Sequence, residues 1–79
     1  MPPFRLRLIN GDFTSDSESA FSSAEAAVRA GLEAATSIAR ETLLQGEQTT
    51  AVEVRVEEDG RAVVRRVINL SVSDLSPEG

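Results

Sequence analysis

The clearest pattern of apolar and polar positions lies in the middle of the chain, between Ser22 and Gly46. Apolar or small residues recur there every three or four positions, which is typical of one face of an amphipathic helix. That face would consist of Ala24, Ala27, Val28, Gly31, Leu32, Ala35, Ile38, Ala39, Thr42 and Leu43. The opposite face would consist of Arg29, Glu33, Thr36, Ser37 and Arg40. Ser22 and Glu25 form a capping box that predicts the helix start, and Gly46 suits the left-handed residue that ends a helix.

Gly31 lies in the centre of the apolar face, where glycine costs roughly 1 kcal/mol relative to alanine. It indicates either close contact with another backbone, such as a partner helix, or space for a large side chain from a sheet beneath. We favour the second interpretation. Leu44 lies off the apolar face, and we interpret it as part of a curled last turn rather than as a contact surface.

Strict alternation in the sequence FRLRLI predicts a half-buried strand near the N-terminus. Its two sides would carry Phe4, Leu6 and Leu8 on one and Arg5, Arg7 and Ile9 on the other. Asn10-Gly11 predicts a hairpin turn, because both residues tolerate positive φ. The return strand would be Asp12–Ser15, short and at an edge of the sheet. Residues 16–20 would be a polar connection into the helix.

The acidic segment from Asp12 to Glu18 invites comparison with a calcium loop. Its spacing does not match the twelve-residue EF-hand loop, which needs ligands at alternate positions and a final glutamate. We therefore expect a solvated acidic loop and no metal site.

A second hairpin is predicted in the C-terminal third, where Asp59-Gly60 provides the turn. Its first strand alternates Val52, Val54 and Val56 with Glu53, Arg55 and Glu57. A two-residue turn would place Val56 opposite Val63, Val52 opposite Val67, Val54 opposite Arg65 and Glu53 opposite Arg66. The doublets Val63-Val64 and Arg65-Arg66 interrupt the alternation. They indicate either a bulge that shifts the register or a second surface that also carries apolar groups.

These elements predict an α+β fold: an antiparallel four-stranded sheet (β-β-α-β-β) with one long helix packed on one face. Residues 1–72 would form the single domain, and residues 73–79 a flexible C-terminal tail. The second face of the sheet has no helix to cover it, so it is the candidate interaction surface. Its expected members are Arg5, Arg7, Ile9, Glu53, Arg55, Val64 and Arg66.

Composition limits the function classes. The chain has 79 residues, three Phe, no Tyr or Trp, no Cys and no His, and a net charge of −5. A core this light favours association into a dimer. Without His or Cys the chain lacks the commonest general base, thiolate zinc ligands and disulfides, so we expect no catalysis, no cofactor and no metal. No apolar run is long enough for a membrane span or a signal peptide, so a cytoplasmic protein is expected.

The order of elements resembles a family of short bacterial domains of unknown function that is abundant in alphaproteobacteria. The resemblance rests on Phe4, Asn10-Gly11-Asp12, Asp16, the segment Phe21–Ala27 and Asp59-Gly60. It implies the α+β fold and a cytosolic bacterial setting, and it implies no activity.

The function that we predict is a protein-interaction or regulatory module that self-associates through its sheet as a homodimer, with any other protein partner unidentified. The alternative is a nucleic-acid-binding regulator that uses arginines on the exposed sheet face. Net negative charge, the interruption of the arginines by Glu53 and Glu57, and the absence of aromatic stacking residues disfavour that alternative.

Overall fold

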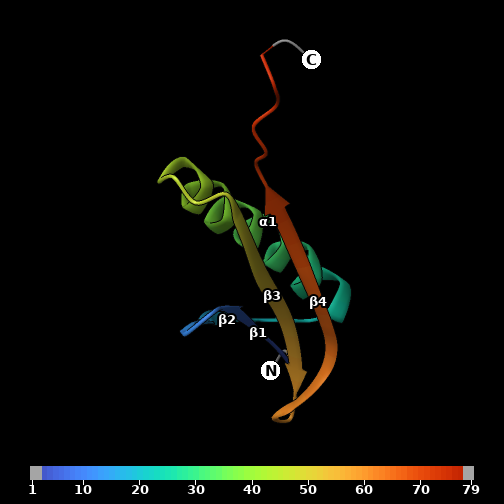
Figure 1. The fold of residues 1–79 in the computed structure, drawn as a ribbon. Helices are drawn as coiled ribbons and strands as arrows, with labels where there is room; N and C mark the ends of the chain where they lie inside the picture. Colours follow the sequence, from blue (N-terminus) through green and yellow to red (C-terminus); the bar gives the residue numbers. More distant parts are fainter. Residues whose placement is uncertain (1–2, 78–79) are drawn as a thin grey trace.

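Four strands and one helix make up the fold (Figure 1), which a computed structural model describes for residues 3–77 apart from the side chain of Glu18. The elements are β1 (Phe4–Asn10), β2 (Phe13–Phe21), α1 (Ala24–Leu44), β3 (Thr49–Glu58) and β4 (Arg61–Ser71). The sheet order is β2-β1-β3-β4, and every neighbouring pair is antiparallel. The predicted α+β fold with four strands and one helix on one face is confirmed.

The helix packs on the sheet through small residues. Its buried positions are Ala27, Gly31, Ala35 and Ala39, and the side chains beneath them on β3 are Val52, Val54 and Val56, all fully buried. A Cβ atom on Gly31 would overlap Val54 Cγ1 and lie 2.7 Å from Leu6 Cδ1. The second interpretation of Gly31 is therefore confirmed, because side chains from the sheet occupy the space that its missing side chain leaves.

Both ends of α1 can be compared with the capping prediction. The N-cap is Ser23, whose backbone is extended and whose hydroxyl accepts a 3.1 Å hydrogen bond from the Ala26 N–H. The prediction of Ser22 as the cap was wrong by one residue, because β2 continues to Phe21 and Ser22 bends the chain between strand and cap. At the other end Gly46 has φ +111°, as expected, and its N–H donates to the Leu43 carbonyl at 3.1 Å.

The second strand is longer than predicted. β2 runs from Phe13 to Phe21, so the residues expected to form a polar connection belong to the sheet. Arg5 lies opposite Ala20 while Arg7 lies opposite Asp16, which leaves three residues of β2 facing Leu6 alone and divides the strand into two segments. Its position at the edge of the sheet was predicted correctly.

The two hairpin turns differ in how they match the prediction. The first turn consists of Gly11-Asp12, with φ +61° at Gly11, whereas Asn10 closes β1 and was wrongly assigned to the turn. The second turn is Asp59-Gly60, where both residues have positive φ as a type I′ turn requires.

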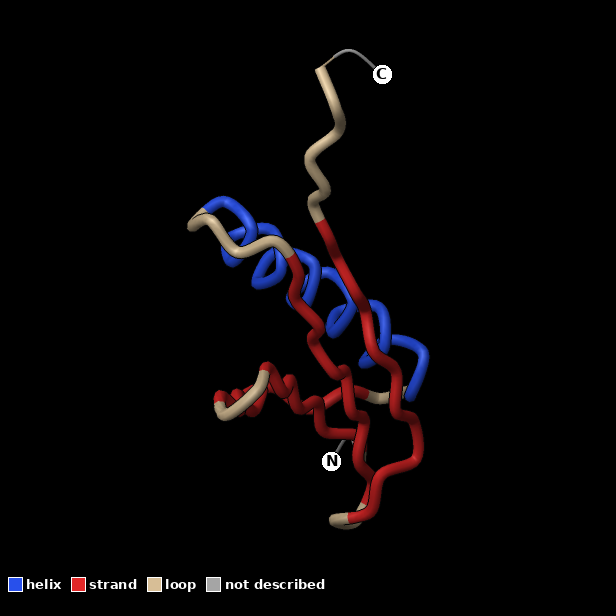
Figure 2. Tube along the Cα trace, in the orientation of Figure 1, coloured by secondary structure: helices blue, strands red, loops and turns tan. Residues whose placement is uncertain are grey.

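The chain beyond β4 extends away from the body of the molecule (Figures 1 and 2). The Val72 N–H donates to the Gln48 carbonyl at 2.8 Å. This hydrogen bond continues the contact between the β3 and β4 segments by one residue past Ser71, the last residue of β4. Residues 73–77 form no helix or strand, and Leu75 is 87% exposed. The rest of the predicted tail, residues 78–79, lies outside the described residues.

Candidate interaction surfaces

The sheet face opposite α1, here called the uncovered face, follows from the strand register. Residues directly opposite one another in antiparallel strands point to the same side of a sheet. Arg55 lies between Arg7 on β1 and Arg65 on β4, and Glu53 lies between Ile9 and Val67. None of these side chains belongs to the buried core against the helix. Five of the seven predicted residues lie on the uncovered face: Arg5, Arg7, Ile9, Glu53 and Arg55.

The other two predicted residues, Val64 and Arg66, lie on the helix side of the sheet, so their placement was wrong. Val64 is opposite Val56, and Arg66 is opposite Val54. The cause is a register shift between Val56 and Glu57, which moves β4 by one position relative to the register of a regular hairpin. Of the two open alternatives the bulge is therefore observed, and Arg65 and Val67 take the places on the uncovered face.

A group of charged side chains around Glu53 joins β3 to β4 on this face. Arg65 Nε donates to Glu53 Oε2 at 2.9 Å, and Arg55 Nε donates to the same oxygen at 3.0 Å. Arg65 also reaches Glu53 Oε1 at 3.4 Å, which gives a two-point contact. These hydrogen bonds, first from Arg65 and then from Arg55, lower the pKa of Glu53 below its usual value. The carboxylate separates two arginines that lie directly opposite one another and would otherwise repel.

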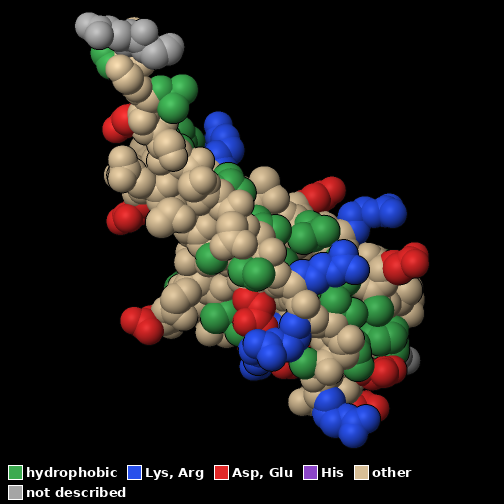
Figure 3. All heavy atoms as spheres, turned by 45° about the vertical axis from the view of Figure 1, so that its right-hand side comes forward, with side chains coloured by type: hydrophobic (Ala, Val, Ile, Leu, Met, Phe, Trp, Pro, Cys, Tyr) green, Lys and Arg blue, Asp and Glu red, His purple; other side chains and the backbone are tan. Residues whose placement is uncertain are grey.

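A second charged group joins β1 to its two neighbours. Arg7 Nε donates to Asp16 Oδ1 on β2 at 2.6 Å, and Arg7 also lies 3.7 Å from the Glu57 carboxylate on β3. The hydrogen bond to Asp16 is the main reason why the pKa of Arg7 is raised above its usual value. Basic and acidic side chains accordingly lie beside one another on the surface that Figure 3 shows.

The free edge of β4 is the longest edge of the sheet. β4 has eleven residues, and only β3 pairs with it. Its large exposed apolar side chains are Val63 and Val67, at 47% and 57% exposure. An edge of this length offers a row of backbone N–H and C=O groups that can pair with another strand.

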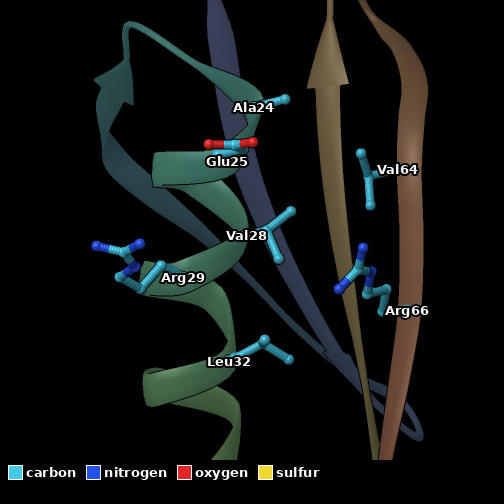
Figure 4. Close-up of a pocket in the computed structure, with 7 residues that line it drawn as sticks. All are labelled: Ala24, Glu25, Val28, Arg29, Leu32, Val64 and Arg66. Carbon is cyan, nitrogen blue, oxygen red and sulfur yellow. The ribbon is translucent and has the colours of Figure 1, made fainter.

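An open groove lies along the helix side of the same strand and is here called the α1–β4 groove (Figure 4). It has a volume of about 510 Å³. The helix supplies Val28 and Leu32, which point toward β4, and the strand supplies Val64 and Arg66. Arg29 and Glu25 lie at its margin. The groove is apolar between charged margins, which suits an apolar side chain better than a small polar substrate.

One known protein family matches the part of the chain that contains all four strands and the helix. A family model described as a domain of unknown function (DUF6894) matches residues 4–71, which runs from the start of β1 to the end of β4. The chain belongs to the DUF6894 family. No curated protein and no solved structure matches the chain.

No three acidic side chains among the described residues gather as metal ligands. No described helix is long and apolar enough to cross a membrane.

Sequence reasoning about the DUF6894 domain missed Arg65, Val67 and the α1–β4 groove. The doublets Val63-Val64 and Arg65-Arg66 were the signal for the first two, because doublets in an alternating strand mark a bulge. The groove had no sequence signal, since it depends on the angle at which α1 crosses the sheet.

Proposed function

We propose that this DUF6894 domain is a non-catalytic protein-interaction or regulatory module that self-associates through its sheet. The observation that carries the proposal is the free edge of β4, eleven residues long, with exposed Val63 and Val67 and an apolar groove beside it. Long edge strands in monomeric proteins are usually protected by a bulge, a proline, charged side chains or a covering segment. β4 carries Arg61, Arg65 and Arg66, but residues 67–71 carry no charge. The only register shift between β3 and β4 lies next to the turn, so residues 64–71 stay regular.

The uncovered face is less suited than the β4 edge to serve as the interface between two copies. Glu53 is already bonded to Arg55 and Arg65, and Arg7 is bonded to Asp16. Packing a second copy on this face would remove water from these charges, and Glu53, Glu57 and Asp16 are already paired with arginines of the same chain. Pairing at the β4 edge leaves the same ion pairs in place.

The alternative function, nucleic-acid binding, draws little support from this geometry. Three of the arginines that would contact phosphate, Arg7, Arg55 and Arg65, are each held by an acidic side chain. Phosphate binding would have to displace those carboxylates, in a chain whose net charge is −5. We also propose a bacterial, cytoplasmic setting for the protein, as the resemblance implies.

Light scattering coupled to size-exclusion chromatography tests the proposal. The 8.4 kDa chain should elute with the mass of two chains at high micromolar loading and move toward the mass of one chain on dilution. The mass of one chain at every loading would contradict self-association.

A further inference from the structure

The α1–β4 groove and the free edge of β4 adjoin one another. Val64 and Arg66 belong to the edge strand and also line the groove. Any strand that paired with β4 would therefore place its helix-side residues at the open side of the groove. The shared residues therefore limit which residues of a second copy can lie opposite each position of β4.

We infer that two copies pair β4 with β4 in antiparallel orientation about a two-fold axis at Val67, an inference that rests on the proposed function. A continuous sheet requires paired residues to point to the same side, so the axis must pass through a residue rather than between two. On the uncovered face, Val67 then meets the Val67 of the second copy, and Arg65 meets Asn69. On the helix side, Arg66 meets Ile68 and Val64 meets Leu70.

Neighbouring positions of the axis fit less well. An axis at Arg65 or Arg66 places two arginines directly opposite one another, which is destabilising in a sheet. An axis at Ile68 avoids this repulsion but sets the exposed Val67 against Asn69. Only the axis at Val67, among these four residues, pairs the exposed valine with an apolar group and keeps all arginines apart.

The same axis supplies an occupant for the α1–β4 groove. Leu70 of the second copy, opposite Val64 and on the helix side, would enter the groove beside Val28 and Leu32. Ile68 of the second copy would follow it and cover the aliphatic stem of Arg66.

The orientation of the helix leaves room for this arrangement. In Figures 1 and 2, α1 crosses the sheet diagonally, so that its N-terminal end lies beside β4 and its C-terminal end lies on the other side of β3. Ile68 and Leu70 are accordingly only partly buried in their own chain. The two-fold axis brings these under-covered residues of one copy beside the N-terminal half of α1 of the other.

Disulfide cross-linking tests the inference directly, because the chain contains no cysteine and each introduced thiol is the only one present. Val67→Cys places two thiols opposite one another across the axis, within disulfide reach. Mild oxidation should therefore convert most of this variant to a covalent dimer. Asn69→Cys is the matched control on the same face of the same strand. Its two thiols would be about four residues apart along the strands, roughly 13 Å, and should cross-link several-fold less.

Two further variants distinguish the other modes. Thr14→Cys reports pairing at the β2 edge, and Ile9→Cys reports packing through the uncovered face; dominant cross-linking of either would overturn the inference. Efficient cross-linking of Asn69→Cys rather than Val67→Cys would overturn the register. If scattering shows a dimer and neither Val67→Cys nor Asn69→Cys cross-links, the β4 pairing is wrong while the proposed function stands. If scattering shows one chain at every loading, the proposed function fails and the inference fails with it.

Discussion

Gly31 of α1 lies directly against Val54 of β3, so closely that a Cβ atom on the glycine would overlap a methyl group of the valine. The helix can approach the sheet to this distance because the residues around the contact are also small, Ala27 and Ala35 among them. The bulk of the core therefore comes from the sheet, where Val52, Val54 and Val56 are fully buried. Close-packed interiors tolerate neither extra volume nor lost volume at such a point.

Replacing Gly31 with Leu should lower the free energy of unfolding by ~1–3 kcal/mol, because the new side chain cannot enter without moving Val54 or Leu6. The midpoint of urea denaturation measures the change. Ser37→Leu, on the exposed face of the same helix, is the matched control and should change stability little. An unchanged midpoint for Gly31→Leu would contradict the packing described here.

The N-cap gives a second test of local structure. Ser23→Ala removes the acceptor of the Ala26 N–H and should cost ~0.5–2 kcal/mol of stability. Ser22→Ala should have little effect, since the Ser22 side chain lies outside the cap. Thermal or urea unfolding of both variants compares the two serines, and a larger loss at Ser22 would restore the capping box with Glu25.

The Glu53 carboxylate gives a pH-dependent prediction. Its pKa in the folded state lies below the usual value of 4.5, so the carboxylate stabilises the fold above that pH. The contribution is lost as the pH falls through the lowered folded-state pKa. Arg65→Gln removes the largest cause and should raise the pKa of Glu53 toward its usual value. A carboxyl-carbon NMR titration measures it, with Arg40→Gln on the far side of the helix as the control. An identical Glu53 titration in wild type and Arg65→Gln would mean that the ion pair does not form in solution.

Nucleic-acid binding is predicted to be absent or weak at physiological salt. Fluorescence anisotropy with labelled single- and double-stranded DNA and with RNA measures it. A tight complex whose affinity falls steeply with rising salt, and which is lost on replacing Arg5, Arg7 and Arg55, would contradict this expectation.

The helix and its buried face could be predicted from the sequence because the apolar period is long and regular. β2 could not, because its residues from Asp16 to Ser19 are all polar, so the alternation of a half-buried strand is missing. An edge strand that is exposed to water has the composition of a loop, and its assignment depends on pairing with β1. Phe21, which lies opposite Phe4, was the one apolar sign that the strand continued.

The candidate interaction surface could be predicted only in part, because strand pairing again decided the outcome. Positions on β1 and β3 followed from alternation, whereas those on β4 depended on a register that the doublets left undecided. A bulge of one residue exchanges the two faces of a strand, so Val64 and Arg66 moved to the helix side and Arg65 and Val67 replaced them.

Two variants at single positions separate the modes of association. Ile9→Asp introduces a charge on the uncovered face and should leave the dimer intact if the β4 edges pair. Val67→Asp places two carboxylates opposite one another at the two-fold axis and should weaken the dimer strongly, because like charges directly opposite in a sheet repel. Loss of the dimer in Ile9→Asp as well would assign the interface to the uncovered face, on which Ile9 and Val67 both lie.

Sedimentation equilibrium at micromolar concentrations measures the central claim most directly. Wild type and Ile9→Asp should fit the mass of two 8.4 kDa chains, and Val67→Asp should shift toward the mass of one. A wild-type mass of one chain over the whole concentration range would contradict self-association through the sheet.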